Sequence, residues 1–503
     1  MMERDTFLLG VDVGTSSLKI VLVAADGTIA VEASAAYPTR FPKPGWAEQA
    51  PDDWASALAK CLHLVDSENR GILQKIKGVG LTGQMISLVV TDAEGTPTRP
   101  CILWHDQRCA EQVQALSEEQ KARIRRTALT PVNTAYTIPR LRWIKDHEPS
   151  VYNKSTHAMW AKDFLRFSLT AEPATDCSDA SGSLTFDSKE RRWSSELADI
   201  WGIDMDRLPP VMESEAIVAG VSNKAARRYG LPPGIPVIAG CGDVLAENVA
   251  AGNIASTDRL LRFGSGGSVS ALTKTTPTDA DQYCPLYCHA VPGAWLWESS
   301  THGFGSSLAW AAEMLGLGTA AELVEVASSS PPGANGVLFQ PPIQGPPNFD
   351  PDFRGGFFGF APRHSRSDLA RAVLEGTSCS FAEAYELLDR AMDLTEANRH
   401  ERTHYAVGAG VRSELLGSVV AYLAGADLTI LSGAEPAVGS AVLAGTACGI
   451  FPSLSEGAKR SRKVLRIQEV RDSEIDTYRR LYERFLSSKT AVRTLSTLTG
   501  QKD

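Results

Sequence analysis

Two aspartates stand beside glycine-rich turns in otherwise apolar stretches, and both could take part in chemistry. The first, Asp12, interrupts the apolar run 7–13, which is followed by a turn of glycine, threonine and two serines at 14–17. An acid in an apolar strand is costly without a partner, and a Mg2+ ion carried by a nucleotide would be a suitable one. The residues after Gly14 can point N–H groups and hydroxyls at an anion, and Lys19 can supply a point charge to a phosphate. An ordinary hairpin with an exposed turn is the alternative interpretation.

The second aspartate, Asp243, lies at a corner between a short apolar strand and a helix. Residues 236–239 are apolar, residues 240–242 form a Gly-Cys-Gly turn, and residues 244–251 have a helical pattern. An aspartate at such a corner commonly caps the helix. Capping would explain the aspartate, but it would not explain the two glycines that flank Cys241.

The opening hairpin has a counterpart in the second half of the chain. Residues 259–273 predict a strand, a glycine- and serine-rich turn containing Gly264 and Ser265, and a returning strand. Two such hairpins suggest a duplicated fold that closes on a nucleotide from both sides. Residues 404–425 predict a strand, a glycine-rich turn and a helix, and glycines there would let the backbone lie flat against a ring next to a helix N-terminus.

Further polar residues follow predicted strands in the first half. The strand at 76–81 leads into residues 84–87, Gln-Met-Ile-Ser. Asp106 and Arg108 lie at the end of another apolar strand, where they could bind sugar hydroxyls or could pair with each other. The polar segment 176–183 could be a site loop or a plain surface loop.

Composition narrows the class of protein. The chain has 503 residues, 43% of them apolar and 22% charged, which is typical of a soluble globular protein with at least two domains. Its net charge of −9 argues against nucleic-acid binding. No signal peptide is recognisable, and no apolar run approaches the ~18 residues of a membrane helix. Nine scattered cysteines favour a reducing compartment, so we expect a cytoplasmic protein.

Three potential metal ligands lie close together in the sequence. Cys284, Cys288 and His289 form a C-x3-C-H cluster. No second pair of ligands follows at a spacing typical of zinc sites. A structural role is therefore favoured over metal binding.

Together these motifs resemble those of the FGGY carbohydrate kinases, within the actin, Hsp70 and sugar-kinase ATPase superfamily, and most closely those of the xylulokinases. The likeness covers nearly the whole chain. Besides the two hairpins and the corner at Asp243, it includes the segment TIPRLRW at 137–143, where Arg140 replaces the usual lysine, and the GGGARS-like loop 408–413. The likeness lapses at 345–347 and resumes at 354–359.

The resemblance implies an α/β fold of two ribonuclease H-like domains with a central cleft. The N-terminal domain would span 1–252 and carry the sugar site, the first phosphate loop and the catalytic aspartate. The C-terminal domain would span 253–487 and carry the second phosphate loop and the adenosine site. A tail would follow at 488–503.

The resemblance also implies ATP-dependent phosphorylation of a small sugar, such as D-xylulose to D-xylulose 5-phosphate, with Mg2+ as cofactor. Asp243 would be the general base and Asp12 the residue that helps to hold Mg2+. The implied nucleotide contacts are Asp12, Gly14, Thr15, Ser16, Lys19, Gly264, Ser265, Gly305, Gly408, Ala409, Gly410 and Ser413. The implied sugar contacts are Gln84, Met85, Ile86, Trp104, Asp106, Asp243 and Val244.

Two departures concern the sugar. Ile86 and Val244 stand where xylulokinases have a histidine and an asparagine that contact the sugar, so two polar partners have become apolar together. A pocket that binds a hydroxyl by hydrogen bonds discriminates through such groups. Another ketose, or a polyol such as a tetritol or pentitol, is therefore the alternative substrate.

Other classes of function remain as alternatives. An actin- or Hsp70-like nucleotide switch would lack the corner at Asp243, and a silent sugar-binding relative would not need Asp12 and Lys19. The expected partner is a small sugar or polyol, with no nucleic acid and no membrane. Dimers are common among the related kinases, so a homodimer is one assembly that the resemblance implies, although the sequence does not fix the oligomeric state.

Overall fold

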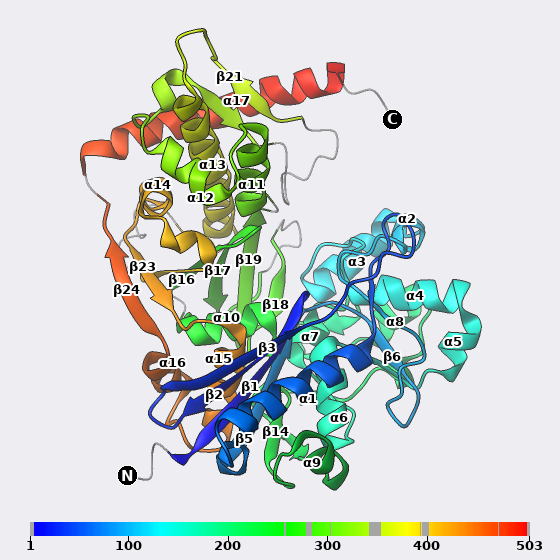
Figure 1. Cartoon of the computed structure of the whole chain (residues 1–503). Coiled ribbons are helices and arrows are strands. Elements are labelled where there is room, and N and C mark those ends of the chain that lie inside the picture. Colours follow the sequence, from blue (N-terminus) through cyan, green and yellow to red (C-terminus); the bar gives the residue numbers. More distant parts are fainter. Residues whose placement is uncertain are drawn as a thin grey trace.

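A computed structural model describes residues 5–255, 258–277, 284–301, 303–341, 354–392, 394, 402–470 and 472–499. Two seven-stranded sheets, one from each half of the chain, organise the molecule (Figure 1). The departure from the family pattern at 345–347 lies outside the described residues. Among the residues that are described, no helix has both the length and the apolar character needed to cross a membrane.

The first sheet contains the predicted opening hairpin. Strand β1 (Phe7–Val13) pairs antiparallel with β2 (Ser17–Ala24) and parallel with β5 (Ile76–Gly83). The apolar side chains of β1 are buried, as expected for a central strand covered on both faces. The strand order is β13 (Ile217–Gly220), β14 (Pro236–Ile238), β5, β1, β2 and β3 (Ile29–Ala36), with β15 (Cys241–Gly242) pairing with the end of β5.

The second sheet repeats this pattern. Strand β16 (Arg259–Phe263) pairs antiparallel with β17 (Gly267–Thr273) and parallel with β22 (His404–Val407), as β1 pairs with β2 and β5. The predicted duplication of the hairpin is thus confirmed. The strand order is β18 (Leu286–Cys288), β19 (Trp295–Thr301), β17, β16, β22, β23 (Leu428–Ser432) and β24 (Lys463–Gln468).

Two helices lie between the sheets (Figure 1). Helix α10 (Asp243–Ala251) begins at the predicted corner, and α15 (Pro436–Ala447) packs against it and against β1 and β5. A Cβ atom on Gly10 of β1 would lie 1.9 Å from the carbonyl oxygen of Ala437 of α15. Glycine is therefore required at this crossing of helix and strand. A segment far along the chain thus covers the first sheet.

The remaining helices cover the outer faces of the sheets and form a lobe beside the first one (Figure 1). The first sheet is covered by α1 (Pro51–Glu68), in which Trp54 is buried, and by α6 (Ala161–Thr170) and α9 (Asn223–Tyr229). The lobe contains α2 (Ala110–Gln114), α3 (Glu118–Ala128), α4 (Thr137–His147), α5 (Pro149–Lys154), α7 (Cys177–Ser181) and α8 (Ser195–Trp201). The second sheet carries α11 (Phe304–Met314), α12 (Ala320–Ala327), α13 (Arg366–Ala391), α14 (Glu414–Ala424) and α17 (Asp472–Thr499), while α16 (Leu454–Ser461) packs near α15.

The last helix is longer than the sequence suggests. Helix α17 continues to Thr499, past the position near 487 where we expect the folded domain to end. Lys489 forms an ion pair with Glu383 at 2.7 Å, and Val492 is buried. These contacts with the body of the domain explain why the helix continues.

Candidate active site

Asp243 occupies the first turn of α10, directly behind the end of the central strands. Strand β15, which carries Gly242, pairs with the last residues of β5 and so delivers Asp243 to that edge of the sheet. The N-cap position belongs to Gly242, but Asp243 Oδ1 accepts a hydrogen bond from the N–H of Val244 at 2.9 Å, so Asp243 does make a capping contact with the first turn of α10. A Cβ atom on Gly242 would lie 2.4 Å from Cγ of Met85, which explains one of the two glycines by close packing.

Asp12 lies near the end of β1, opposite Lys19 of β2 and Thr82 of β5. Its Oδ1 atom is buried and has no hydrogen-bond partner among the described residues. Burial, together with the nearby charge of Asp243, raises the pKa of Asp12 to about 7. A buried carboxylate oxygen without a partner suits a cation, so the residues present fit Mg2+. The alternative of an ordinary hairpin with an exposed turn explains the turn but not the buried, unpartnered Oδ1 atom of Asp12.

The turn after Asp12 is tight and partly accessible. The N–H of Gly14 donates to the carbonyl of Ser17 at 3.1 Å, and the side chain of Ser16 is exposed. The carbonyl of Thr15 accepts a hydrogen bond from Gln49 Nε2 at 2.6 Å. Lys19 forms an ion pair with Glu435 at 3.0 Å, with both side chains about half exposed. Lys19 therefore lies at the rim of this turn, held by the residue that precedes α15.

The second hairpin turn packs against the start of α11. The N–H of Gly305 donates to the carbonyl of Gly264 at 3.1 Å, and the N–H of Ser306 donates to the carbonyl of Ser265 at 3.0 Å. A Cβ atom on Gly305 would lie 2.5 Å from the Gly264 carbonyl oxygen. The structure thus brings together three predicted nucleotide residues that lie about 40 positions apart.

A charged group that the sequence analysis does not predict lies beside Asp243. Arg262 of β16 forms an ion pair with Glu247 of α10, with Nε and Oε2 2.5 Å apart. Glu247 follows Asp243 by one helical turn. Burial raises the pKa of Asp243, and the charge of Arg262 is the largest opposing influence. Burial also raises the pKa of Glu298 on β19, again opposed by Arg262.

The sequence contains an indication that Arg262 is unusual, although it does not identify its partner. Arg262 interrupts the apolar strand pattern of residues 259–263, just as Asp12 interrupts the pattern of residues 7–13. A charge within an apolar strand calls for a partner. The partner, Glu247, could not be identified before the helix α10 and the strand β16 were placed next to each other.

The predicted sugar residues fall into two groups. Gln84 and Met85 are buried where β5 ends, and Ile86 and Val244 are partly exposed near Asp243. Trp104 is 39% exposed, and its Nε1 lies 3.5 Å from the hydroxyl of Thr15. These side chains lie around the end of the central strands.

Asp106 differs from the other predicted sugar residues. Its side chain is fully buried and forms two hydrogen bonds with the guanidinium of Arg108, at 2.9 and 2.8 Å. The N–H of Ala47 also donates to Asp106 Oδ2 at 2.6 Å. The structure therefore favours the alternative in which Asp106 and Arg108 pair with each other.

The polar segment 176–183 is not a surface loop. It contains the buried helix α7, and Lys162 forms ion pairs with Asp163, Asp176 and Asp179 at 2.6, 3.0 and 3.0 Å. The hydroxyl of Ser178 accepts a hydrogen bond from the N–H of Gly242 at 3.0 Å. The surface-loop alternative is wrong because this network buries the segment behind the corner that carries Asp243.

The predicted adenosine loop has the expected order of strand, turn and helix. Gly408 has a φ of +97°, and a Cβ atom there would lie 2.7 Å from the carbonyl oxygen of Phe263. Packing against the end of β16 therefore requires this glycine. Ala409 is exposed, and Ser413 caps α14 by accepting a hydrogen bond from Leu416 N at 3.0 Å.

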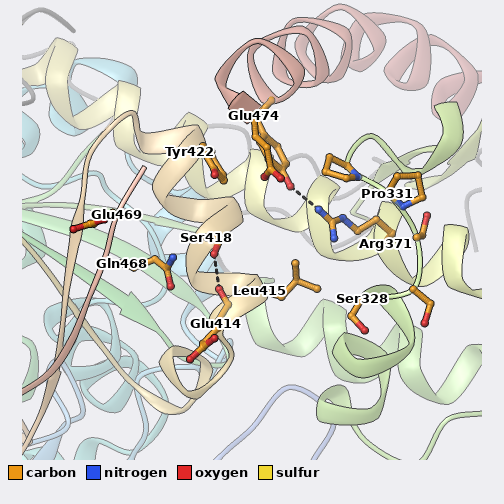
Figure 2. Close-up of a pocket in the computed structure, with 14 residues that line it drawn as sticks. Ser328, Pro331, Arg371, Glu414, Leu415, Ser418, Tyr422, Gln468, Glu469 and Glu474 are labelled. Atoms are coloured by element: carbon orange, nitrogen blue, oxygen red, sulfur yellow. Dashed lines mark hydrogen bonds between the residues drawn. The ribbon is translucent and has the colours of Figure 1, made fainter. Parts of the chain in front are cut away.

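A cavity of about 600 Å³ adjoins this loop (Figure 2). It lies between α14, the end of α12 and the start of α17, and begins at Glu414, the residue after Ser413. None of the predicted site residues lines it. The predicted residues instead lie near the ends of β1, β5 and β16.

The cysteine and histidine cluster is packed in the interior. Cys284, Cys288 and His289 are buried, and His289 Nδ1 accepts a hydrogen bond from the N–H of Val291 at 2.9 Å. Burial lowers the pKa of His289 to about 3. Within the described ranges, no three acidic, histidine or cysteine side chains are arranged to hold a metal ion.

Comparisons with known proteins agree on one family. Residues 7–250 match the N-terminal domain, and residues 262–448 the C-terminal domain, of the FGGY family of carbohydrate kinases. The chain is 33% identical over 460 residues to the xylulose kinase of Lactococcus lactis subsp. lactis (strain IL1403), covering 90% of each protein. It is 26% identical over 404 residues to the gluconokinase of Bacillus subtilis (strain 168), covering 77% of this chain and 78% of that protein. The crystal structure of xylulose kinase from Rhodospirillum rubrum superposes with a TM-score of 0.89 at 26% identity, covering 98% of this chain and 100% of that one.

Proposed function

The chain belongs to the FGGY family of carbohydrate kinases and is an ATP-dependent sugar kinase, and we propose that its acceptor is a pentulose, D-xylulose, which it converts to D-xylulose 5-phosphate. The proposed substrate follows from the names of the two more similar proteins reported above that are xylulose kinases. One observation carries the assignment of the active site: Asp12 and Asp243 lie at the same end of β5, because Asp12 pairs with Thr82 and Gly242, which precedes Asp243, pairs with Gly83.

Asp243 acts as the general base. Its carboxylate orients the acceptor hydroxyl and takes its proton as the phosphoryl group is transferred. An ordinary aspartate is a weak base for an alcohol, but a loose transition state lets the proton leave late. Burial raises the pKa of Asp243 above its usual range, and this strengthens it as a base.

The two hairpin turns hold the phosphates from opposite sides. On one side Gly14, Thr15, Ser16 and Lys19 face the phosphates, and on the other Gly264 and Ser265, with Gly305 behind them. The hydroxyls of Thr15, Ser16 and Ser265 donate to phosphate oxygens, while the N–H groups of Gly14 and Gly305 hold the two turns in shape by donating to Ser17 and Gly264. The adenosine then lies along the loop formed by Gly408, Ala409, Gly410 and Ser413.

Asp12 is the residue that holds Mg2+. The unpartnered, buried Oδ1 atom supports this role. Bound Mg2+ would neutralise charge on the transferring phosphoryl group. A domain boundary near 252 is part of the same proposal, as is a homodimer, whereas the C-terminal domain includes α17 to Thr499 and does not end near 487.

The acceptor side determines which sugar is used. Ile86 and Val244 offer no hydrogen bonds from their side chains, so D-xylulose would be held by fewer polar contacts than a histidine and an asparagine provide. Another ketose or a polyol is the alternative for this reason. Gluconate, the acceptor named for the more distant relative, is disfavoured because the negative charges of Asp243, Glu247 and Glu298 all act on one guanidinium, that of Arg262, which Glu247 already pairs with.

The test is ADP production from Mg-ATP with a panel of pentuloses, hexuloses, polyols and gluconate. We expect D-xylulose to be the best acceptor and Asp243→Asn to lower kcat by about 100- to 10,000-fold, as for loss of a general base. If another compound of the panel is phosphorylated more efficiently than D-xylulose, that compound is the acceptor and the D-xylulose assignment is wrong. ADP release that needs no acceptor and survives in Asp243→Asn would refute the mechanism.

A further inference from the structure

The segment 84–87 joins the end of β5 to the residues around Asp243, and its backbone is strained. Ile86 has a φ of +57°, in the left-handed region that a β-branched residue rarely adopts. The N–H of Ser87 donates to the carbonyl of Met85 at 2.8 Å, so the chain reverses direction within three residues. A turn of this kind persists only when its surroundings hold it in place.

One buried guanidinium supplies much of this support. Arg140 of α4 is fully buried. Its Nη1 lies 2.9 Å from the carbonyl oxygens of Ile86, Ala135 and Tyr136, and its Nη2 donates to the carbonyls of Trp104 and Thr134. Three segments that are distant in sequence therefore meet on one side chain.

A second donor reaches the same carbonyl. The hydroxyl of Thr137, one helical turn before Arg140, donates to the Ile86 carbonyl at 3.1 Å. On the other side, the side chain of Ile86 touches the end of α7, since a Cβ atom on Gly182 would lie 2.6 Å from Ile86 Cγ2. The turn is thus fixed from both faces.

The turn 84–87 also lies against the segment that carries Asp243, the proposed general base. Met85 packs on Gly242, which precedes Asp243. Burial raises the pKa of Asp243; the charge of Arg262 opposes this most, followed by the N–H of Val244, which donates to Oδ1 at 2.9 Å, and then by the backbone N–H of Met85. The position of this N–H depends on the carbonyl that Arg140 and Thr137 hold, because both belong to the same short turn.

We propose that Arg140 is a positioning residue for phosphoryl transfer, which fixes the turn 84–87 against Asp243 and thereby places both the acceptor and the base. This inference rests on the proposed role of Asp243. A lysine, the usual residue of related kinases at this position, has one nitrogen and could not reach carbonyls on both sides of the guanidinium.

The first test compares Thr137→Val with Thr446→Val. Each change removes one hydroxyl that donates to a backbone carbonyl, but Thr446 bonds to Val442 within α15, at 3.0 Å. We expect Thr137→Val to lower kcat/KM for D-xylulose about tenfold and to leave KM for ATP unchanged, since displacement of reacting groups is costly. Thr446→Val should change neither.

The second test is the pH profile, which a merely structural role would not move. If the Met85 N–H no longer stabilises the charged carboxylate, the pKa of Asp243 rises, and the acid limb of kcat/KM shifts to higher pH. We expect this shift in Thr137→Val and a larger one in Arg140→Lys, with kcat/KM for D-xylulose down about 100-fold. If D-xylulose is not the acceptor, the same comparison applies to the best acceptor of the panel.

The outcomes separate this inference from the proposed function. If both variants keep the wild-type pH profile and lose activity only in proportion to their folded fraction, the positioning role is refuted, while a dead Asp243→Asn leaves the base assignment intact. If Asp243→Asn retains acceptor-dependent turnover, Asp243 is not the general base, and the positioning role of Arg140 is refuted as well. Circular dichroism and thermal unfolding give the folded fraction.

Discussion

The two hairpins have the same backbone but carry opposite charges. In the first, Asp12 is the penultimate residue of β1 and is followed by Val13, Gly14 and Thr15. In the second, Arg262 is the penultimate residue of β16 and is followed by Phe263, Gly264 and Ser265. Each strand also pairs with its neighbours in the same way.

This difference shows how a duplicated frame can acquire two roles. The two positions are electrostatically linked: burial raises the pKa of both Asp12 and Asp243, and the charge of Arg262 opposes that rise in each case. An acid on one side suits a cation, and a guanidinium on the other suits an anion.

Of the two hairpins, the first is expected to show the larger effect when its charged residue is removed. Asp12→Asn should lower kcat by on the order of 100- to 1,000-fold, because a group that holds the metal contributes several kcal/mol to the transition state. We also expect a higher Mg2+ concentration for half-maximal binding of ATP, measured by titration calorimetry. Unchanged Mg2+ dependence would remove Asp12 from the metal site.

Asp12→Asn also has an effect on stability whose sign is set by burial. The pKa of Asp12 is about 7 in the folded protein, above its usual 3.8, so ionisation of this group destabilises the fold as pH rises. Without Mg2+, the variant should therefore melt at a higher temperature than the wild type at pH 8, and the difference should shrink toward pH 5. Scanning calorimetry at the two pH values measures it, and Mg-ATP should abolish the advantage.

The next largest effect comes from removing the cation of the second hairpin. Arg262→Gln should lower kcat/KM about 10- to 100-fold and shift its acid limb to higher pH, because the charge that holds down the pKa of Asp243 is lost. The double variant Arg262→Gln, Glu247→Gln is the matched control, since it leaves no unpaired carboxylate beside α10. An unshifted pH profile in both would mean that Arg262 serves only to pair with Glu247.

A smaller effect is expected at the rim of the first turn. Lys19→Met should raise KM for ATP about tenfold, the cost of one phosphate contact of about 1.4 kcal/mol, without lowering the melting temperature. Its ion pair with Glu435 is about half exposed, and such pairs contribute little to stability. Glu435→Gln, which frees Lys19, is the control, and an equal rise in KM there would indicate that the ion pair matters rather than the lysine.

The smallest effect is expected at the hydroxyl of the second turn. Ser265→Thr keeps the hydroxyl, and the Ser265 side chain is exposed, so kcat/KM should stay within about twofold. Ser265→Ala removes the donor and should raise KM for ATP several-fold, about the free energy of one hydrogen bond. Equal kinetics for the alanine and threonine variants would exclude a phosphate contact by this hydroxyl.

The local sequence pattern correctly predicted the main backbone elements around the site. The hairpins, the corner at Asp243 and the loop before α14 are confirmed because glycine-rich turns between apolar runs leave the backbone few other conformations. The family and the kinase activity could also be predicted, since the motifs that carry them are short and continuous in the chain. The individual site residues stay predictions, which the experiments above test.

Other features could not be predicted from the sequence. Asp106 looked equally suited to a sugar and to Arg108, and only its complete burial decides between them. The segment 176–183 is polar enough for a surface loop, yet Lys162 neutralises it in the interior. In both cases the sequence contains the partner, Arg108 or Lys162, but it does not show that the partner lies within reach of the acidic side chains.

The sequence by itself determined the strands, the turns and the residues placed at their ends, because these depend on backbone freedom and on the local pattern of apolar side chains. Tertiary structure alone decided which charges meet: Arg262 with Glu247, and Arg140 with carbonyls from three separate segments. A charged side chain is stable in the interior only where several distant elements bring it partners. Those partners are fixed by how strands and helices pack, and no local pattern contains that information.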